Sequence, residues 1–229
     1  MPDVTVRAKD GGQFSAYLAT PAGTGPGIVV IQEIFGVNPW IRQVADRYAK
    51  AGYVAMAPDL FWRISPGIQL TDTGEDFQKA LGLMQKLDQD RAVEDIQATI
   101  DALRANPACN GKVGAVGYCL GGRLAYMTAA RTNSDASVGY YGVMIDALIG
   151  EAGKIAKPLM LHIAEKDGFV PPPVQAKMKE GLKGNRLVTL ETYADQDHAF
   201  ARDGGEHFDQ KAATLANDRT AAFFKQHLA

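Results

Sequence analysis

Residues 112–130 limit the fold of this chain more than any other stretch. They begin with a short apolar run of the kind found in β-strands, pass through a tight turn at Gly117, and continue from Arg123 in a run typical of a helix. Cys119 lies at the tip of the turn, between Gly117 and Gly121. Glycines are expected there because side chains would push the strand and the helix apart. The stretch therefore predicts a strand, a thiol and a helix, in that order.

The pattern Gly-x-Cys-x-Gly around Cys119 is that of a nucleophile elbow, with a thiol in place of the usual serine hydroxyl. The amide of Leu120, at the start of the helix, can donate to a developing oxyanion, and the helix dipole favours a thiolate. The alternative is a glycine-rich turn that carries a buried, inert cysteine. The choice between these two interpretations depends on whether residues elsewhere in the chain could serve as the base and the acid.

The length of 229 residues fits one α/β domain over residues 1–229, because two domains of ordinary size would be tight. The net charge of -2 gives no basic surface for nucleic acid or an anionic membrane, so a small molecule is the expected partner. No apolar run reaches transmembrane length, and residues 1–6 lack the layout of a signal peptide. We therefore expect a cytoplasmic protein.

The chain has two cysteines, Cys109 and Cys119. This number excludes a disulfide framework and a four-cysteine metal site, and no metal is expected. Cys109 is expected in a loop just before a strand, as a small, partly buried residue.

Strand and helix patterns alternate along the chain. Residues 3–20 predict a β-hairpin around a turn at 9–12, and residues 75–104 predict two helices with a break near 88–90. Further strands are expected at 27–31, 53–59, 137–143, 158–164 and 187–193, and further helices at 40–50 and 206–227. This alternation predicts a mostly parallel sheet with helices on both faces, an antiparallel hairpin at the N-terminus and no large lid domain.

Thiol chemistry needs a base that takes the proton and an acid that orients the base. Cys119, Asp167 and His198 each follow a different predicted strand, so they should gather along one edge of the sheet. Their order along the chain is the nucleophile, acid and histidine order of the α/β-hydrolase fold. Asp195 and Asp197 compete for the acid's role, but both are too near His198 in sequence to come from a separate strand end.

The other three histidines have simpler interpretations. His162 lies within a predicted strand, where a packed or hydrogen-bonded core histidine is expected. His207 and His227 fall on the predicted last helix and are expected to be exposed.

Glu33 and Ile34 follow the predicted strand at 27–31. This is the strand edge where open α/β sheets bind ligands, so Glu33 is either a functional carboxylate or a solvated loop acid. The amide of Ile34 is the simplest second donor, beside that of Leu120, for an oxyanion hole.

Six segments, taken together and in order, resemble the dienelactone hydrolase (carboxymethylenebutenolidase) family. They are Gln-Glu-Ile-Phe-Gly at 32–36, Pro-Asp-Leu at 58–60, Gly-Tyr-Cys-Leu-Gly-Gly at 117–122, Val-Gly-Tyr-Tyr-Gly at 138–142, Asp-Gly-Phe-Val-Pro at 167–171 and His-Ala-Phe-Ala-Arg at 198–202. The resemblance implies a monomeric, cofactor-free hydrolase that opens a lactone through an acyl-enzyme on Cys119.

The resemblance also implies roles for other residues. A glutamate at the position of Glu33 contacts the thiol and helps to form the thiolate, and the arginine at Arg202 binds the substrate's carboxylate. Tyr140, Phe35 and Trp62 are expected to line the substrate site.

One departure from the family pattern concerns the charge of the substrate. Members that cleave dienelactone carry a second arginine and a tyrosine where this chain has Phe77 and Leu81, neither of which binds an anion. Arg63 could substitute, or it could be an ordinary exposed loop arginine. Apolar Phe77, Leu81 and Met84 on one helical face would suit a less charged or larger substrate.

The sequence thus predicts a cysteine-nucleophile hydrolase of a lactone or enol ester, such as 4-carboxymethylenebut-2-en-4-olide. A general thiol-dependent carboxylesterase or acyltransferase is an alternative, as is a non-catalytic binding protein on the same fold. Nucleotide binding is excluded, because Gly114, Gly117, Gly121 and Gly122 do not form Gly-x-Gly-x-x-Gly.

Overall fold

The computed structural model describes residues 3–229. Met1 and Pro2, which belong to the segment considered above for a signal peptide, lie outside the described residues. The chain divides into two compact units, one ending at Ala115 and the other beginning at Val116, and strand β5 (Cys109–Tyr118) belongs to both. The assignment of residues 1–229 to one domain stays a prediction.

The first unit begins with the predicted hairpin. Strands β1 (Asp3–Arg7) and β2 (Gln13–Ala19) pair antiparallel, and β2 also pairs antiparallel with β4 (Val54–Pro58). Strand β3 (Gly25–Ile31) pairs parallel with β4, and the strand order in this unit is β1-β2-β4-β3-β5. From Ile28 to Ile31 the residues of β3 are fully buried, as expected for a parallel strand covered on both faces.

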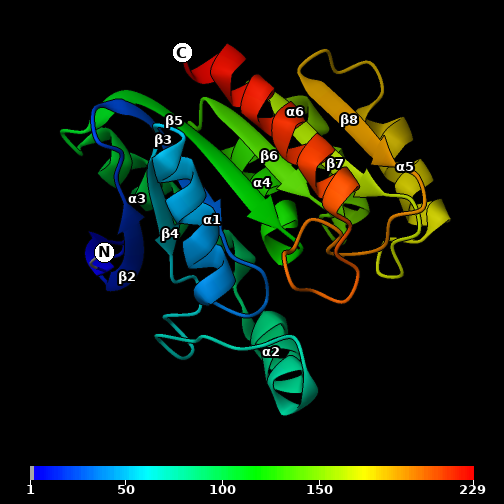
Figure 1. Cartoon of the computed structure of the whole chain (residues 1–229), viewed down its shortest axis with the longest axis horizontal. Coiled ribbons are helices and arrows are strands. Elements are labelled where there is room, and N and C mark those ends of the chain that lie inside the picture. The colour runs from blue at the N-terminus through cyan, green and yellow to red at the C-terminus, as the bar shows by residue number, and fades with distance from the viewer. Residues whose placement is uncertain (1–2) are drawn as a thin grey trace. The chain divides into compact units, whose positions relative to one another are not determined.

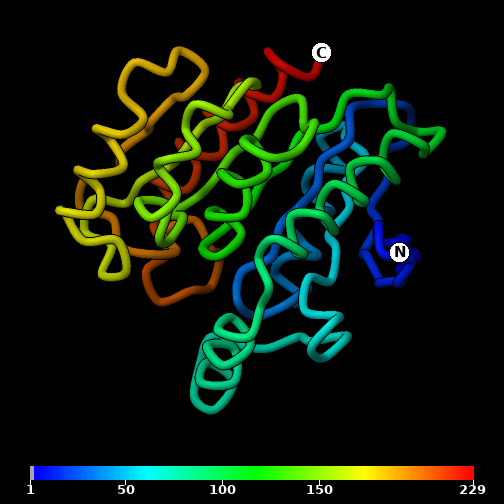
Figure 2. The backbone as a smooth tube through the Cα atoms, turned by 180° about the vertical axis from the view of Figure 1, so that it is seen from behind, coloured from blue at the N-terminus to red at the C-terminus, as the bar shows by residue number. Residues whose placement is uncertain are grey.

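Helices cover this sheet on both sides. Helices α1 (Pro39–Lys50) and α3 (Gln89–Arg104) lie on opposite faces of β3 and β4, while α2 (Gly74–Lys86) extends beyond the strand ends (Figures 1 and 2). Helix α1 begins where the Asn38 side chain accepts the amide hydrogen of Ile41, and α3 begins with Asp88 in the same capping role. The predicted break near 88–90 therefore falls at a helix cap.

The second unit contains the parallel strands β6 (Ala136–Tyr140), β7 (Leu159–Ala164) and β8 (Val188–Tyr193), in the order β5-β6-β7-β8. Helices α4 (Leu120–Arg131) and α6 (Gln210–Leu228) lie on opposite faces of these strands (Figures 1 and 2). A 3₁₀ helix, η1 (Ile145–Lys154), and helix α5 (Pro172–Leu182) complete the unit. The structure confirms the predicted α/β fold, with its mostly parallel strands and antiparallel hairpin.

Several boundaries differ from the predictions. Cys109 is the first residue of β5 rather than a loop residue, and β6 ends at Tyr140 because Tyr141 has a φ of 38°. The last helix starts at Gln210, where the Asp209 side chain caps it, and not at 206. Helices η1 and α5 were not predicted, and α5 begins in the proline-rich segment because proline is well tolerated in the first turn of a helix.

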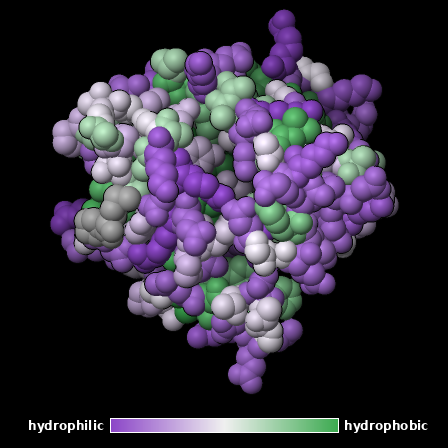
Figure 3. Space-filling model, in the orientation of Figure 1, coloured by the Kyte–Doolittle hydropathy of each residue, from purple (hydrophilic) through white to green (hydrophobic). Residues whose placement is uncertain are grey.

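The outer surface is mostly polar on the face shown in Figure 3, where apolar residues form small separate areas. Within residues 3–229, no helix has both the length and the apolar character needed to span a bilayer.

Candidate active site

Cys119 lies in the single-residue turn between β5 and α4 and has a φ of 56° and a ψ of -115°. A non-glycine residue in such a conformation costs about 1–3 kcal/mol, so its neighbours must hold it. The amide hydrogen of Cys119 is donated to the carbonyl of Tyr140 at 3.1 Å, and its own carbonyl accepts from the amide of Arg123 at 3.2 Å. The strained turn leaves Leu120 as the first residue of α4.

The glycines around the elbow are required by close backbone packing. A Cβ atom on Gly117 would lie 1.9 Å from the carbonyl oxygen of Gly121, and one on Gly122 would lie 2.5 Å from that of Tyr140. Both distances are shorter than any real carbon contact, so neither position admits a side chain. This is the crowding that the sequence pattern predicted.

The structure brings the three candidate side chains of the second unit together. His198 donates its Nδ1–H to Asp167 Oδ2 at 2.8 Å, and a second hydrogen bond joins the imidazole to Cys119. Because Nδ1 faces the carboxylate, the thiol meets Nε2. The other oxygen of Asp167 accepts the amide hydrogen of Phe169 at 2.8 Å, which holds the buried carboxylate in place.

The charge state of His198 depends on its two partners. Burial by itself lowers the pKa of His198, but the negative charge of Cys119 and the hydrogen bonds that the imidazole donates to Asp167 and Cys119 outweigh it and raise the pKa to about 10. The imidazolium form is therefore favoured when the sulfur is a thiolate. Chemically, the site can remove a thiol proton and keep it on the imidazole beside the sulfur.

The competing aspartates do not orient the imidazole ring. Asp195 forms an exposed ion pair with Lys166 at 2.6 Å. Asp197 Oδ1 accepts the amide hydrogen of His198 at 2.6 Å and that of Gly168 at 3.1 Å, so its carboxylate links the loop after β8 to the loop after β7. These backbone hydrogen bonds outweigh burial and lower the pKa of Asp197, so it links the loops as a carboxylate.

Two aromatic rings that sequence reasoning missed pack on the His198 ring. The ring of Tyr141 meets it edge-on with 5.1 Å between centroids, and that of Phe169 does so at 4.9 Å. Phe169 is 61% exposed, which is unusual for phenylalanine and places an apolar edge beside the imidazole. The available signal was the position of Phe169 two residues after Asp167, in a loop at a strand end.

Tyr140, a predicted substrate-site residue, is hydrogen-bonded within the second unit. It is fully buried, and its hydroxyl lies 3.1 Å from the Ala216 carbonyl and 2.6 Å from the Thr220 hydroxyl, both on α6. The side chain is thus hydrogen-bonded to α6 inside the unit, and its predicted place in the substrate site stays a prediction. Tyr141, whose backbone turns to positive φ, is the tyrosine beside His198.

Arg202 and the three other histidines also lie in the second unit. Arg202 is half-buried in the loop between β8 and α6, four residues after His198. His162 is a core histidine, as the sequence indicated, and burial lowers its pKa to about 3. His207 lies before α6 rather than on it, half-exposed, and donates Nδ1–H to the carbonyl of His198 at 3.1 Å. His227 lies near the end of α6, with its ring against Phe223, and is only partly exposed.

The remaining predicted site residues belong to the first unit. Glu33, Ile34 and Phe35 lie in the loop after β3, which begins at Gln32, and are buried, and the carbonyl of Phe35 accepts the amide hydrogen of Leu70 at 2.9 Å. Their roles toward the thiol, the oxyanion and the substrate stay predictions. The ring of Phe77 on α2 lies near that of Phe35, with 6.4 Å between centroids.

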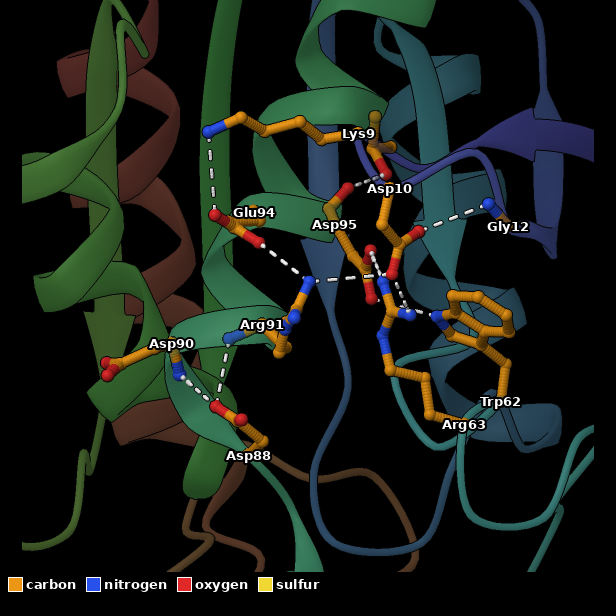
Figure 4. A network of polar contacts seen from close by, with 11 residues as sticks. Lys9, Asp10, Gly12, Trp62, Arg63, Asp88, Asp90, Arg91, Glu94 and Asp95 are labelled. Carbon is orange, nitrogen blue, oxygen red and sulfur yellow. Dashed lines mark hydrogen bonds and ion pairs between the residues drawn. The ribbon is translucent and has the colours of Figure 1, made fainter.

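Trp62 and Arg63 form part of an ion-pair network in the first unit (Figure 4). The indole N–H of Trp62 donates to Asp95 at 2.8 Å. Arg63 lies over the indole ring and binds Asp10 at 2.7 Å and Asp95 at 2.9 Å. Two carboxylates therefore pair with the charge of Arg63, and both its suggested binding of a substrate anion and the predicted substrate contact of Trp62 stay predictions.

Within residues 3–229, no group of three or more His, Cys, Asp or Glu side chains is arranged to hold a metal ion. Both cysteines are free thiols.

The strand order, the cysteine in a strained turn before a helix, and the acid and histidine after later strands define an α/β-hydrolase. The model of the dienelactone hydrolase family matches residues 14–228, and the chain belongs to that family. It is accordingly a hydrolase that acts on carboxylic ester bonds.

Relatives and solved structures agree with this assignment. The chain is 51% identical to "Putative carboxymethylenebutenolidase" of Azospirillum brasilense over all of both chains. It is 38% identical to "Carboxymethylenebutenolidase 1" of Cupriavidus pinatubonensis over 95% of this chain and 93% of that one. The solved structure of "Putative Dienelactone Hydrolase" from Klebsiella pneumoniae is 26% identical, covers 98% of each chain and has a TM-score of 0.87.

Proposed function

We propose that the protein hydrolyses a lactone or enol ester through an acyl-enzyme on Cys119. The observation that carries the proposal is the imidazole of His198, hydrogen-bonded to the Cys119 thiol on one side and to the Asp167 carboxylate on the other. An inert structural cysteine needs neither partner. Family relatives named carboxymethylenebutenolidase support a lactone as the substrate.

The proposed reaction begins with proton transfer from the thiol to His198 Nε2. The thiolate then attacks the carbonyl carbon, and the oxyanion accepts hydrogen bonds from the amide of Leu120 and, by our prediction, that of Ile34. As the first residue of α4, Leu120 has an amide without an acceptor in the helix, so it can serve the oxyanion. The imidazolium returns its proton to the leaving oxygen, and water releases the acyl group.

A thiol nucleophile favours substrates with a good leaving group. When the leaving group is a poor alkoxide, the tetrahedral adduct expels the thiolate instead. An enol or enolate departs more easily, so an enol lactone suits this site. We expect weak activity toward simple alkyl esters.

The proposed substrate carries at most one strongly bound carboxylate. Arg202, four residues after His198, is the proposed anion-binding group. Arg63 is neutralised by Asp10 and Asp95, and the family's second arginine is replaced by Phe77. A 4-carboxymethylenebut-2-en-4-olide or a larger, less charged lactone is therefore the proposed class.

A hydrolysis screen tests the proposal directly. Wild type, Cys119→Ala and the matched control Cys109→Ala are assayed on enol lactones with and without a carboxylate. We expect Cys119→Ala to lose at least about a thousandfold in kcat, as removal of a nucleophile does in other hydrolases, and Cys109→Ala to keep its activity. Mass spectrometry should detect an acyl adduct on Cys119 of the wild type. Undiminished hydrolysis by Cys119→Ala would exclude the thiol mechanism.

The carboxylate-binding role is tested with Arg202→Ala on the same substrates. The variant should raise KM for the charged lactones and leave KM for the uncharged ones within about twofold. Equal effects on both would remove Arg202 from substrate recognition.

We also propose a cytoplasmic monomer, which size-exclusion chromatography of the purified protein and fractionation of cells can test.

A further inference from the structure

Four buried polar side chains of the second unit form a continuous chain of hydrogen bonds. The hydroxyl of Tyr193 lies 2.7 Å from His162 Nδ1, and the hydroxyl of Thr220 lies 2.9 Å from His162 Nε2. Thr220 in turn lies 2.6 Å from the hydroxyl of Tyr140. We call these four residues the buried polar chain. They come from β8, β7, α6 and β6, and each is at most 4% exposed.

The proton order at one end of the chain follows from groups that can only accept. The hydroxyl of Tyr140 lies 3.1 Å from the carbonyl oxygen of Ala216 and 3.1 Å from Asn217 Oδ1. A carbonyl oxygen cannot donate, so any hydrogen bond on this side is donated by Tyr140. In the arrangement where Tyr140 donates here, the bond between Tyr140 and Thr220 is donated by Thr220.

The rest of the order follows from this first step. Because the hydroxyl proton of Thr220 is used, its oxygen accepts Nε2–H of His162. His162 is neutral, so its Nδ1 carries no proton and accepts from the hydroxyl of Tyr193. The guanidinium of Arg219, which only donates, supplies the hydrogen bond to the Tyr193 oxygen. In this arrangement each member has a hydrogen-bond partner, and His162 is the Nε2–H tautomer.

Two members of the buried polar chain accept backbone hydrogen bonds from the two strained residues at the candidate site. The carbonyl of Tyr140 accepts the amide hydrogen of Cys119 at 3.1 Å, and the carbonyl of His162 accepts that of Tyr141 at 2.8 Å. Cys119 has a φ of 56° and Tyr141 a φ of 38°. Each strained backbone is thus hydrogen-bonded to a member of the buried polar chain.

Strained residues of this kind persist only when their surroundings determine their positions. A buried polar group that loses its partner also destabilises the fold, so a fully hydrogen-bonded set of buried side chains resists displacement. The buried polar chain holds Tyr140 and His162 in place in this way. Because the carbonyls of these two residues bind the amides of Cys119 and Tyr141, it also holds the elbow at Cys119 and the Tyr141 ring, which packs against His198.

We propose that Thr220, through its bonds to His162 and Tyr140, positions the Cys119 sulfur and the His198 ring for proton transfer. Thr220 is a positioning residue and touches no substrate. The inference deepens the proposed thiol chemistry and rests on it.

The test measures the reactivity of the sulfur itself, independently of any lactone. Alkylation of Cys119 by iodoacetamide is followed by peptide mass spectrometry across pH in wild type, Thr220→Val and Thr220→Ser. We expect Thr220→Val to react about tenfold more slowly at neutral pH, because the sulfur leaves its position beside the imidazole, and Thr220→Ser to restore the rate. Cys109 in the same digest is the internal reference.

Thr99→Val is the matched control. Thr99 is also a buried helical threonine, and its hydroxyl donates to the Asp95 carbonyl at 2.8 Å in the first unit. Its loss should destabilise the fold by a similar amount and leave Cys119 alkylation within about twofold of wild type. If Thr220→Val does not fold, Tyr140→Phe removes only the hydroxyl at the other end of the bond and should give the same slow alkylation with an unchanged KM.

Folded Thr220→Val or Tyr140→Phe with the wild-type alkylation profile would overturn the positioning role. Lactone hydrolysis by wild type is measured in parallel. Slow alkylation of the variants, combined with no lactone hydrolysis by wild type, would refute the proposed function and support the positioning role. Lactone hydrolysis by wild type, combined with wild-type alkylation rates in the variants, would support the proposed function and refute the positioning role.

Discussion

The buried imidazole of His162 makes the stability of the protein depend on pH in a way that can be calculated. Burial lowers the pKa of His162 to about 3 in the folded protein, against about 6.5 in an unfolded chain. The ionisable groups that face it are Arg219 on α6, whose positive charge also lowers this pKa, Tyr193 on β8 and Tyr140 on β6. Between pH 6.5 and 3, the unfolded state therefore binds a proton that the folded state does not.

The sign and size of the effect follow. The stabilisation is complete above pH 6.5 and is lost as the pH falls toward 3, at about 1.4 kcal/mol per pH unit. From pH 6.5 to 5, the free energy of unfolding should fall by about 2 kcal/mol from this residue alone. Most carboxylates titrate below pH 5, so the change in the free energy of unfolding between pH 6.5 and 5 comes mainly from histidines.

Urea unfolding followed by circular dichroism at half-unit steps of pH measures this slope. His162→Gln cannot titrate and should be less stable at pH 6.5 but lack the slope of His162. His227→Gln, a histidine near the end of α6, should keep the wild-type slope. A wild-type free energy of unfolding that is flat between pH 6.5 and 5, or an equal slope in His162→Gln, would refute the reasoning.

Three further predictions follow from the geometry. Asp167→Asn should lower the pKa of His198 and reduce kcat by about 10²–10⁴-fold, as shown by NMR titration and steady-state kinetics; an unchanged pKa would contradict the hydrogen-bond geometry. Gly117→Ala should yield little folded protein, whereas Gly168→Ala, with open space around the new methyl group, should express normally. Arg63→Ala should destabilise the fold by about 1–3 kcal/mol in urea unfolding and leave KM for anionic lactones unchanged; a rise in that KM would restore it as an anion-binding residue.

Much of the architecture could be predicted because its signals are local. The apolar run of β3 and the glycine pattern around Cys119 are each read from fewer than a dozen neighbouring residues, and the structure has both features where the sequence placed them. The contact between Asp167 and His198 was also predictable, since parallel strands place the loops that follow them along one edge.

The errors arose where backbone conformation or distant partners decide the outcome. The predicted strand at 137–143 ends at Tyr140, because Tyr141 turns to positive φ, and this turn places the Tyr141 ring beside His198. Thr220 meets residues 58 and 80 positions away, and nothing in its local pattern marks these partners. His207 supports the His198 carbonyl from an irregular loop, which has no periodicity to interpret.

The carboxylate of Asp197 has a consequence for how enzymes of this kind can change their substrates. It holds the amides of Gly168 and His198 at the same time, so neither loop can lengthen or shift without releasing the other. Insertions, in natural relatives and in redesigned variants, should therefore be rare in these two loops. They should be commoner in segments that no side chain links to another loop in this way. Libraries that randomise loop length between β7 and α5 should yield few active clones unless the aspartate and its two amides are retained.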